Sequence, residues 1–310
     1  MSDLHTISEA PVASEPHGKP AKAAKNNSLW SDAWYDLRHN KVFVIGAVLA
    51  LVLVVMAIFP GLFSPINAFD SGHCNLIDAR KGITSEHWFG TDSQGCDTYA
   101  RVIYGARISI LVGILTSIIT GLVGGALGLL AGYLGKWTDI ILSRVAEVFF
   151  AIPSILGALL ILSVVGRNNA GVWTVVMALS VLAWPMVLRI MRASVISTKN
   201  QDYITAARAL GASPWRISTK HILPNAIAPV IVVCTMNLGV FIAAEAALSF
   251  LGVGIQSPGI SWGLMISDGR NRFLMAPEPL LFPAIFLSIT VLSFVMIGDA
   301  VRDALDPKLR

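Results

Sequence analysis

Six long apolar stretches constrain the fold of this 310-residue chain more than any other feature of its sequence. They are 17 to 27 residues long, and an α-helix needs about 20 residues to cross the hydrocarbon core of a membrane. Charged residues make up only 14% of the chain, against roughly 25% in soluble proteins, so lipid replaces water around much of it. We therefore expect an all-α membrane protein with six transmembrane helices. The expected spans are Val42–Phe59, Ile108–Leu134, Ile140–Val165, Val172–Leu188, Ala226–Leu251 and Leu280–Val301.

The distribution of basic residues predicts how the spans cross the membrane. With both termini in the cytoplasm, the cytoplasmic segments hold 15 of the 23 Lys and Arg residues and the outer segments hold seven. Cytoplasmic loops of membrane proteins carry this excess. We therefore expect cytoplasmic termini, outer segments at 60–107 and 252–279, and a long cytoplasmic loop at 189–225.

The region before the first span divides into two parts. Residues 1–28 are rich in Ala, Pro, Ser, Lys and Glu, which is typical of a disordered cytoplasmic tail. Residues 29–41 are expected to form an amphipathic helix at the membrane surface, followed by a transmembrane domain over 42–310. The apolar residues that share one side of this helix are Leu29, Trp30, Ala33, Trp34 and Leu37.

The cytoplasmic loop has the pattern of two short helices joined by a turn. Residues 202–210 favour a helix, and Gly211 stands where a glycine commonly ends one. Ser213 and Pro214 are typical of the cap and first residue of the next helix. Pro224 is expected to break that helix before the fifth span.

This elbow of two helices allows two interpretations. Small Ala206 and Ala207 would let another protein approach closely, while Arg208 and Arg216 could pair with acidic groups on that partner. Alternatively, the basic loop lies on anionic lipid headgroups.

The elbow also resembles a known motif. Thr205-Ala206-Ala207, Gly211 and Leu223-Pro224 have the spacing of the EAA motif, which marks the permease subunits of ATP-binding-cassette (ABC) importers. Thr205 stands where the motif has glutamate, and His221 stands where it has isoleucine.

The resemblance extends to the dipeptide/oligopeptide permease C-type subunits and covers about residues 30–310. Those subunits typically have arginine where Cys96 stands. The segments that are similar in order and spacing are Gly90–Asp97, Tyr104–Ser109, Ala151–Ser154, Glu245–Gly254, Ser261–Gly263, Asp268–Arg270, Gly298-Asp299 and Arg302–Pro307.

This resemblance implies a type I ABC importer permease fold in the plasma (inner) membrane of a prokaryote. It implies that the elbow is seated on a separate ATPase, of which two copies bind ATP and Mg²⁺, and that a second permease subunit and an external solute-binding protein complete the importer. The implied cargo is short peptides, with nickel chelates and glutathione left open. The elbow residues implied to contact the ATPase are Ala206, Ala207, Arg208, Gly211, Trp215, Arg216 and Pro224.

Two acidic residues inside the expected spans are candidates for a translocation path, because charges at membrane depth are costly and often functional. Glu147 can pair with Arg144 three residues before it on the same helix. Glu245 has no obvious local partner; it either lines the path or pairs with another helix.

Cys74 and Cys96 both fall in the first outer segment, away from the reducing cytoplasm. A disulfide between them would close a loop of about 22 residues. The alternative is two free thiols.

Three further features bear on packing. The pairs Gly121/Gly125 and Gly124/Gly128 have the GxxxG spacing that lets helices approach closely in lipid. Pro153 and Pro185 could kink the third and fourth spans. In the second outer segment, Trp262 either begins a short helix on the membrane face or anchors a packed loop at the interface.

Several classes of function are excluded by what the sequence lacks. It has no phosphate-binding loop of the ATPase type, so ATP must be hydrolysed by partners. Its six histidines are scattered, so we expect no metal site, and nothing indicates catalytic residues or nucleic-acid binding. The competing classes are a proton-coupled secondary transporter that uses Glu245 or Glu147, and a membrane scaffold.

Overall fold

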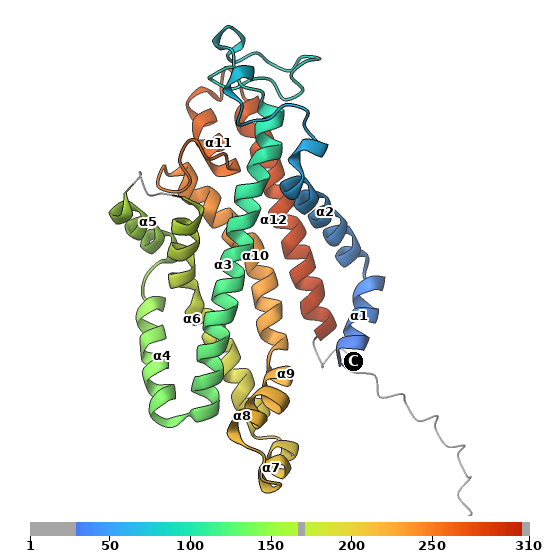
Figure 1. Ribbon diagram of the computed structural model, residues 1–310, viewed down its shortest axis with the longest axis vertical. Coiled ribbons are helices and arrows are strands. Elements are labelled where there is room, and N and C mark those ends of the chain that lie inside the picture. The colour runs from blue at the N-terminus through green and yellow to red at the C-terminus, as the bar shows by residue number, and fades with distance from the viewer. Residues whose placement is uncertain (1–28, 167–170, 306–310) are drawn as a thin grey trace, which may run out of the picture.

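The computed structural model describes residues 29–166 and 171–305, so the tail expected at 1–28 lies outside the described residues. Every regular element in the described part is a helix (Figure 1). The helices are α1 (Leu29–His39), α2 (Lys41–Ile58), α3 (Thr98–Leu134), α4 (Lys136–Phe150), α5 (Ser154–Val165), α6 (Val172–Lys199), α7 (Asp202–Ala209), α8 (Pro214–Arg216), the π-helix η5 (Ile217–Ile222), α9 (Leu223–Ala226), α10 (Ala228–Phe250), α11 (Trp262–Gly269) and α12 (Glu278–Leu305), with short 3₁₀ turns at Pro60–Leu62, Ser71–His73, Leu76–Asp78 and Arg270–Arg272.

Among the described residues, five helices are long and apolar enough to cross a membrane, namely α2, α3, α6, α10 and α12. The bent pair α4 and α5 supplies a sixth crossing if it is counted as one span. The first, fifth and sixth predicted spans agree with α2, α10 and α12 within a few residues. The second begins earlier than expected, because Asp97 caps α3 by accepting the Ala100 N–H at 2.7 Å.

The third predicted span, Ile140–Val165, is not one straight helix. α4 and α5 meet at 84° across the break after Phe150. Proline has no backbone N–H and disfavours a helical conformation in the residue before it. Pro153 therefore ends the first helix, and α5 starts at Ser154.

The fourth predicted span was too short, and the loop predicted at 189–225 begins instead at Asn200. α6 continues through Pro185 to Lys199. Two arginines of the predicted loop, Arg189 and Arg192, therefore lie on the surface of α6. Arg192 binds Asp139 of α4, and the Arg189 guanidinium lies 4.2 Å from the centre of the Phe150 ring.

α3 and α6 form the most extensive helix–helix contact among the described residues. A Cβ atom added at Gly124 or Gly128 would stand 2.6 Å from the carbonyl oxygen of Trp184 or Leu188, so only glycine permits this approach. The Gly124/Gly128 pair is therefore the GxxxG motif that packs against α6, whereas Gly125 faces open space.

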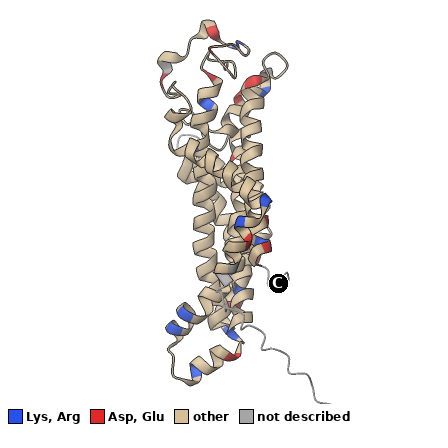
Figure 2. Ribbon diagram, turned by 90° about the vertical axis from the view of Figure 1, so that its right-hand side faces the viewer, with Lys and Arg blue, Asp and Glu red and all other residues tan. Residues whose placement is uncertain are grey.

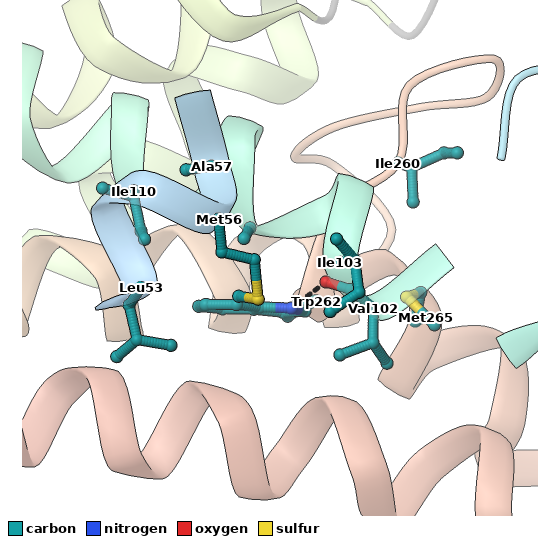
Figure 3. Close-up of a cluster of buried hydrophobic side chains, with 10 residues drawn as sticks. Leu53, Met56, Ala57, Val102, Ile103, Ile110, Ile260, Trp262 and Met265 are labelled. Atoms are coloured by element: carbon teal, nitrogen blue, oxygen red, sulfur yellow. Dashed lines mark hydrogen bonds between the residues drawn. The ribbon is translucent and has the colours of Figure 1, made fainter. Parts of the chain in front are cut away.

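We call the end of the molecule that carries residues 59–97 and α11 the loop end, and the opposite end, with α7 to α9, the elbow end (Figure 1). A core at the loop end surrounds Trp262, which is fully buried and donates its indole N–H to the Val102 carbonyl at 2.9 Å. Figure 3 shows the indole lying between Met56, Leu53 and Val102. Trp262 thus begins the expected short helix and is a core residue, not a membrane anchor.

The predicted surface helix is present as α1, and it also packs within the protein. Ala33 and Leu37 are buried against Ala300 and Ala304 of α12, whereas Trp34 is exposed. α1 and the end of α12 stop well short of the elbow, so α3, α4, α6 and the elbow project beyond them (Figure 1). Figure 2 shows the charged residues gathered at the two ends of the molecule and beside the end of α12.

Candidate functional site

The elbow, which we define as residues 200–227, joins α6 to α10 and forms the tip of the elbow end (Figure 1). Its first turn is set by Gly211, whose φ of 82° lies in the left-handed region. The Gly211 N–H bonds to the Arg208 carbonyl at 3.0 Å, and the Ala212 N–H bonds to the Ala207 carbonyl at 3.1 Å. This is a Schellman motif, which confirms that Gly211 ends the first helix.

The second helix of the elbow begins as predicted and ends differently. Ser213 accepts the Arg216 N–H on its hydroxyl at 3.3 Å, and Pro214 is the first helical residue. Pro224 does not end the helical segment. The residues before it form a π-helix, in which the Leu223 N–H bonds to the Ser218 carbonyl. The wider winding accommodates the missing N–H, and α9 continues to Ala226.

The underside of the elbow packs on the bundle. Three isoleucines of the elbow, Ile204, Ile217 and Ile222, are fully buried. They belong to one core cluster with Met191 and Val195 on the inner face of α6. Since α7, α8 and α9 have eight residues or fewer, too few to be stable alone, this packing fixes their position.

The tip of the elbow exposes apolar side chains. Leu210 is 88% exposed and Trp215 is 78% exposed, while Tyr203 beside them is also exposed. Large apolar groups gathered on a surface mark an interaction site. They lie next to Arg208 and Arg216, neither of which forms an ion pair within the described part of the chain.

The structure therefore gathers the predicted elbow residues on one surface feature. Ala206, Arg208, Gly211, Trp215, Arg216 and Pro224 are exposed, and Ala207 is half-buried. The arrangement offers an apolar tip flanked by cations. Such a surface fits a protein partner with an apolar pocket and an acidic rim.

Glu245 lies inside the bundle and is fully buried. Ser109 of α3 donates a hydrogen bond to one carboxylate oxygen at 3.0 Å, and Ser249 donates to the other at 2.7 Å. The same two hydroxyls accept the N–H groups of Trp262 at 3.2 Å and Ile255 at 3.0 Å. Glu245 is thus hydrogen-bonded to another helix, and its place on a translocation path stays a prediction. Its serine partner on α3 is 136 residues away and could not be read from local sequence.

Glu147 pairs with Arg144 as expected, with an Nη1–Oε2 distance of 2.8 Å, and both side chains are exposed. Glu147 borders a cavity of about 250 Å³ between α4 and α6. Its place on a translocation path stays a prediction.

Cys74 and Cys96 are joined by a disulfide at the loop end, with the sulfur atoms 2.07 Å apart. Asp92 accepts the Cys96 N–H at 2.9 Å on one carboxylate oxygen and pairs with Arg101 of α3 through the other. Asp268 of α11 lines the same cavity as Asp92 and Arg101. Burial raises the pKa of Asp268, an effect that the Arg101 charge opposes and the Asp92 charge reinforces.

Comparison with known proteins gives consistent matches over nearly the whole chain. Residues 124–310 match the family described as binding-protein-dependent transport system inner membrane component. Residues 28–76 match the N-terminal transmembrane domain of oligopeptide transport permease C.

Two curated relatives and one solved structure illustrate the similarity. The oligopeptide transport system permease protein OppC of Bacillus subtilis is 39% identical over 97% of this chain and 96% of its own length. The glutathione transport system permease protein GsiD of Pectobacterium atrosepticum is 36% identical over 91% and 92%. A chain of the inward-facing MetNI methionine ABC transporter shares the fold, with a TM-score of 0.53 and 20% identity over 66% of this chain and 96% of that one.

Proposed function

The chain belongs to the family of binding-protein-dependent transport system inner membrane components, and from this premise we propose that it is the permease subunit of an ATP-driven importer of short peptides. The observation that carries the proposal is the elbow, whose apolar tip is exposed while its underside is fixed to α3 and α6. An exposed apolar tip on a fixed base is suited to receive force from a partner.

The proposed partner at the elbow is an ATPase. ATP and Mg²⁺ would bind to two ATPase subunits or domains, since this chain lacks a phosphate-binding loop. Leu210 and Trp215 would enter an apolar pocket, with Arg208 and Arg216 against its acidic rim. A second, similar permease subunit would enclose the path with this one, and ATP-driven movement of the elbows would alternate access.

The proposed orientation follows from charge. The elbow carries the basic residues that favour the cytoplasm, so we put the elbow end inside and the loop end outside the inner membrane of a prokaryote. The loop end exposes Leu76, Ile77, Leu274 and Met275. These side chains would contact an external solute-binding protein that delivers the peptide.

Short peptides are the proposed cargo because both relatives compared above are named for peptide substrates, an oligopeptide in one case and the tripeptide glutathione in the other. The match of residues 28–76 to an oligopeptide permease domain supports a peptide longer than a single amino acid. A nickel chelate is the alternative cargo.

The test is purification of the tagged full-length chain from its own membranes in mild detergent, followed by uptake assays in proteoliposomes. We expect a second permease and ATPase subunits to co-purify, and labelled dipeptides or pentapeptides to accumulate only with ATP and the binding protein. Transport by the chain alone on a proton gradient without ATP would overturn the proposal. Uptake of a nickel chelate but of no peptide would reject the peptide cargo and keep the importer.

A further inference from the structure

α4 is the most weakly attached long helix at the elbow end. Of its fifteen residues only Ala146 is buried. Its apolar contacts form one small cluster around Trp184 and Leu188 of α6, to which Phe149 adds an edge-on ring contact at 5.4 Å. This contrasts with the α3–α6 pair, in which glycines of α3 bring the two backbones into close contact. Other contacts must therefore hold α4 in place.

An ion pair supplies such a contact between α4 and α6. The Arg192 guanidinium binds the Asp139 carboxylate through two nitrogens, Nε to Oδ1 and Nη2 to Oδ2, the latter at 2.7 Å. Asp139 lies in the first turn of α4, where the helix dipole favours a carboxylate, and Ser143 donates to it at 3.3 Å. The pair is partly shielded, with 34% of the Arg192 and 21% of the Asp139 side chain exposed.

A second cation on the same face of α6 holds the end of α3. Lys199 stands seven residues after Arg192, and residues at this spacing share one helix face. Its ammonium group donates to the Tyr133 carbonyl at 2.6 Å and to the Gly132 carbonyl at 3.4 Å. The turn between α3 and α4 is thus attached to α6 on both sides.

The same part of α6 carries the elbow. Met191 and Val195 pack against the buried isoleucines of the elbow. Beyond the ion pair toward the loop end, a cavity of about 250 Å³ borders both α4 and α6, and α4 ends at the 84° bend before α5. α4 is therefore connected to the elbow most directly through Arg192.

We propose that Asp139 and Arg192 are positioning residues for the coupling of ATP hydrolysis to transport. Their ion pair makes α4 move together with the inner half of α6 and the elbow, so that displacement of the elbow reaches α4 and the helix bend. This inference rests on the proposed function, since it requires an ATPase that moves the elbow.

The test is a charge exchange in the assembled importer. Asp139→Arg and Arg192→Asp are made singly and together, and the ATP hydrolysed per peptide taken up is measured in proteoliposomes. In each single variant we expect the ATPase subunits to remain bound and the ATP used per peptide to rise about tenfold, as expected from the loss of a charged hydrogen bond. The double variant should recover most of the coupling, because the exchanged charges can pair again; a loss caused by either residue independently of the pair would not be recovered.

A matched control comes from the same helix. Lys136→Glu reverses an exposed charge in the first turn of α4 that forms no ion pair within the described residues, and it should leave the ATP used per peptide unchanged. If Asp139→Arg does not accumulate in the membrane, Asp139→Asn replaces it, because it keeps the size of the side chain.

The outcomes separate this inference from the proposed function. Wild-type coupling in both single variants would overturn the inference alone, and so would an equal loss of coupling in the Lys136→Glu control. Absence of ATP-dependent uptake in the wild-type complex would overturn the proposed function and this inference with it.

Discussion

The two ends of the molecule are stabilised in different ways. At the loop end, a disulfide joins Cys74 to Cys96, the Asp92–Arg101 pair connects this loop to α3, and His87 lies 2.8 Å from Asp97. The elbow has no covalent link and holds its position through a buried apolar underside alone. The loop end is therefore stabilised by links within its own segment and to α3, whereas the position of the elbow depends on packing against neighbouring helices.

This difference suggests where each end meets a partner. Both ends expose apolar side chains, but Leu76 and Ile77 belong to a segment that is held by the disulfide and by the Asp92–Arg101 pair. Leu210 and Trp215 belong to short helices that are held by apolar packing on α6. A surface held by a disulfide and an ion pair, as at the loop end, suits docking. A surface held by apolar packing, as at the elbow, can move with α6 and suits the transmission of force.

The largest expected effect comes from removing the covalent link of the loop end. Cys74→Ser should lower the free energy of local unfolding of residues 60–97 by about 3 kcal/mol, because the closed loop no longer restricts the unfolded segment. Hydrogen exchange of these residues should accelerate on the order of 100-fold, the factor that this energy corresponds to. Exchange in the elbow should not change. Equal acceleration at both ends would show that the two regions are not independent.

A smaller effect is expected at the turn of the elbow. Gly211→Ala adds a Cβ that meets no atom within 4 Å, so its only cost is the left-handed backbone, about 1 kcal/mol. Gly61→Ala at the loop end also meets no atom, and its backbone is not left-handed, so it is the matched control. Hydrogen exchange should rise several-fold in the elbow and remain unchanged around residue 61.

Gly211→Pro sharpens the same comparison, because proline fixes φ near −65° and cannot adopt the observed +82°. This variant should lose ATPase subunits during purification, while the Cys74–Cys96 disulfide at the loop end stays intact. Retention of a fully active ATPase would contradict the role of the turn.

The smallest expected effect is a pH dependence at the loop end. Because burial raises the pKa of Asp268, the folded protein keeps this proton at pH values where the unfolded chain has lost it. The contribution to stability is complete below the usual aspartate range and is lost as the pH rises through the raised pKa. Asp268 is an exposed residue, so solvent screens the effect and the pH dependence is modest.

Asp268→Asn should remove this dependence. The measurement is the thermal unfolding midpoint of the purified protein between about pH 4 and pH 7, the range in which carboxyl groups with raised pKa values titrate. Glu86→Gln, at an exposed carboxylate of the same region, serves as control. An unchanged pH profile in Asp268→Asn would show that other groups cause the dependence.

The features that sequence predicted correctly depend on local patterns. Runs of apolar residues located most of the spans, and Gly211 and Ser213 located the turn of the elbow because capping acts within four residues. Proline gave mixed results. Pro153 lies at the break between α4 and α5, Pro185 lies within the continuous helix α6, and Pro224 follows a π-helix.

The features that sequence missed join residues far apart in the chain. Asp139 and Arg192 are 53 residues apart, and the predicted fourth span ends at Leu188, before the arginine. Glu245 lacked a visible partner because Ser109 lies on another helix. Pairing of this kind depends on which helices become neighbours, which no local periodicity encodes.

The central claim is that the elbow tip contacts an ATPase, and site-specific photo-crosslinking in native membranes tests it most directly. Leu210 is replaced by p-benzoylphenylalanine in the full-length chain, with Leu76 at the loop end as the matched exposed position. We predict that light joins position 210 to a protein whose sequence, read by mass spectrometry, contains a phosphate-binding loop, and that position 76 gives no such product. Absence of that protein at position 210, or its presence at position 76, would contradict the account.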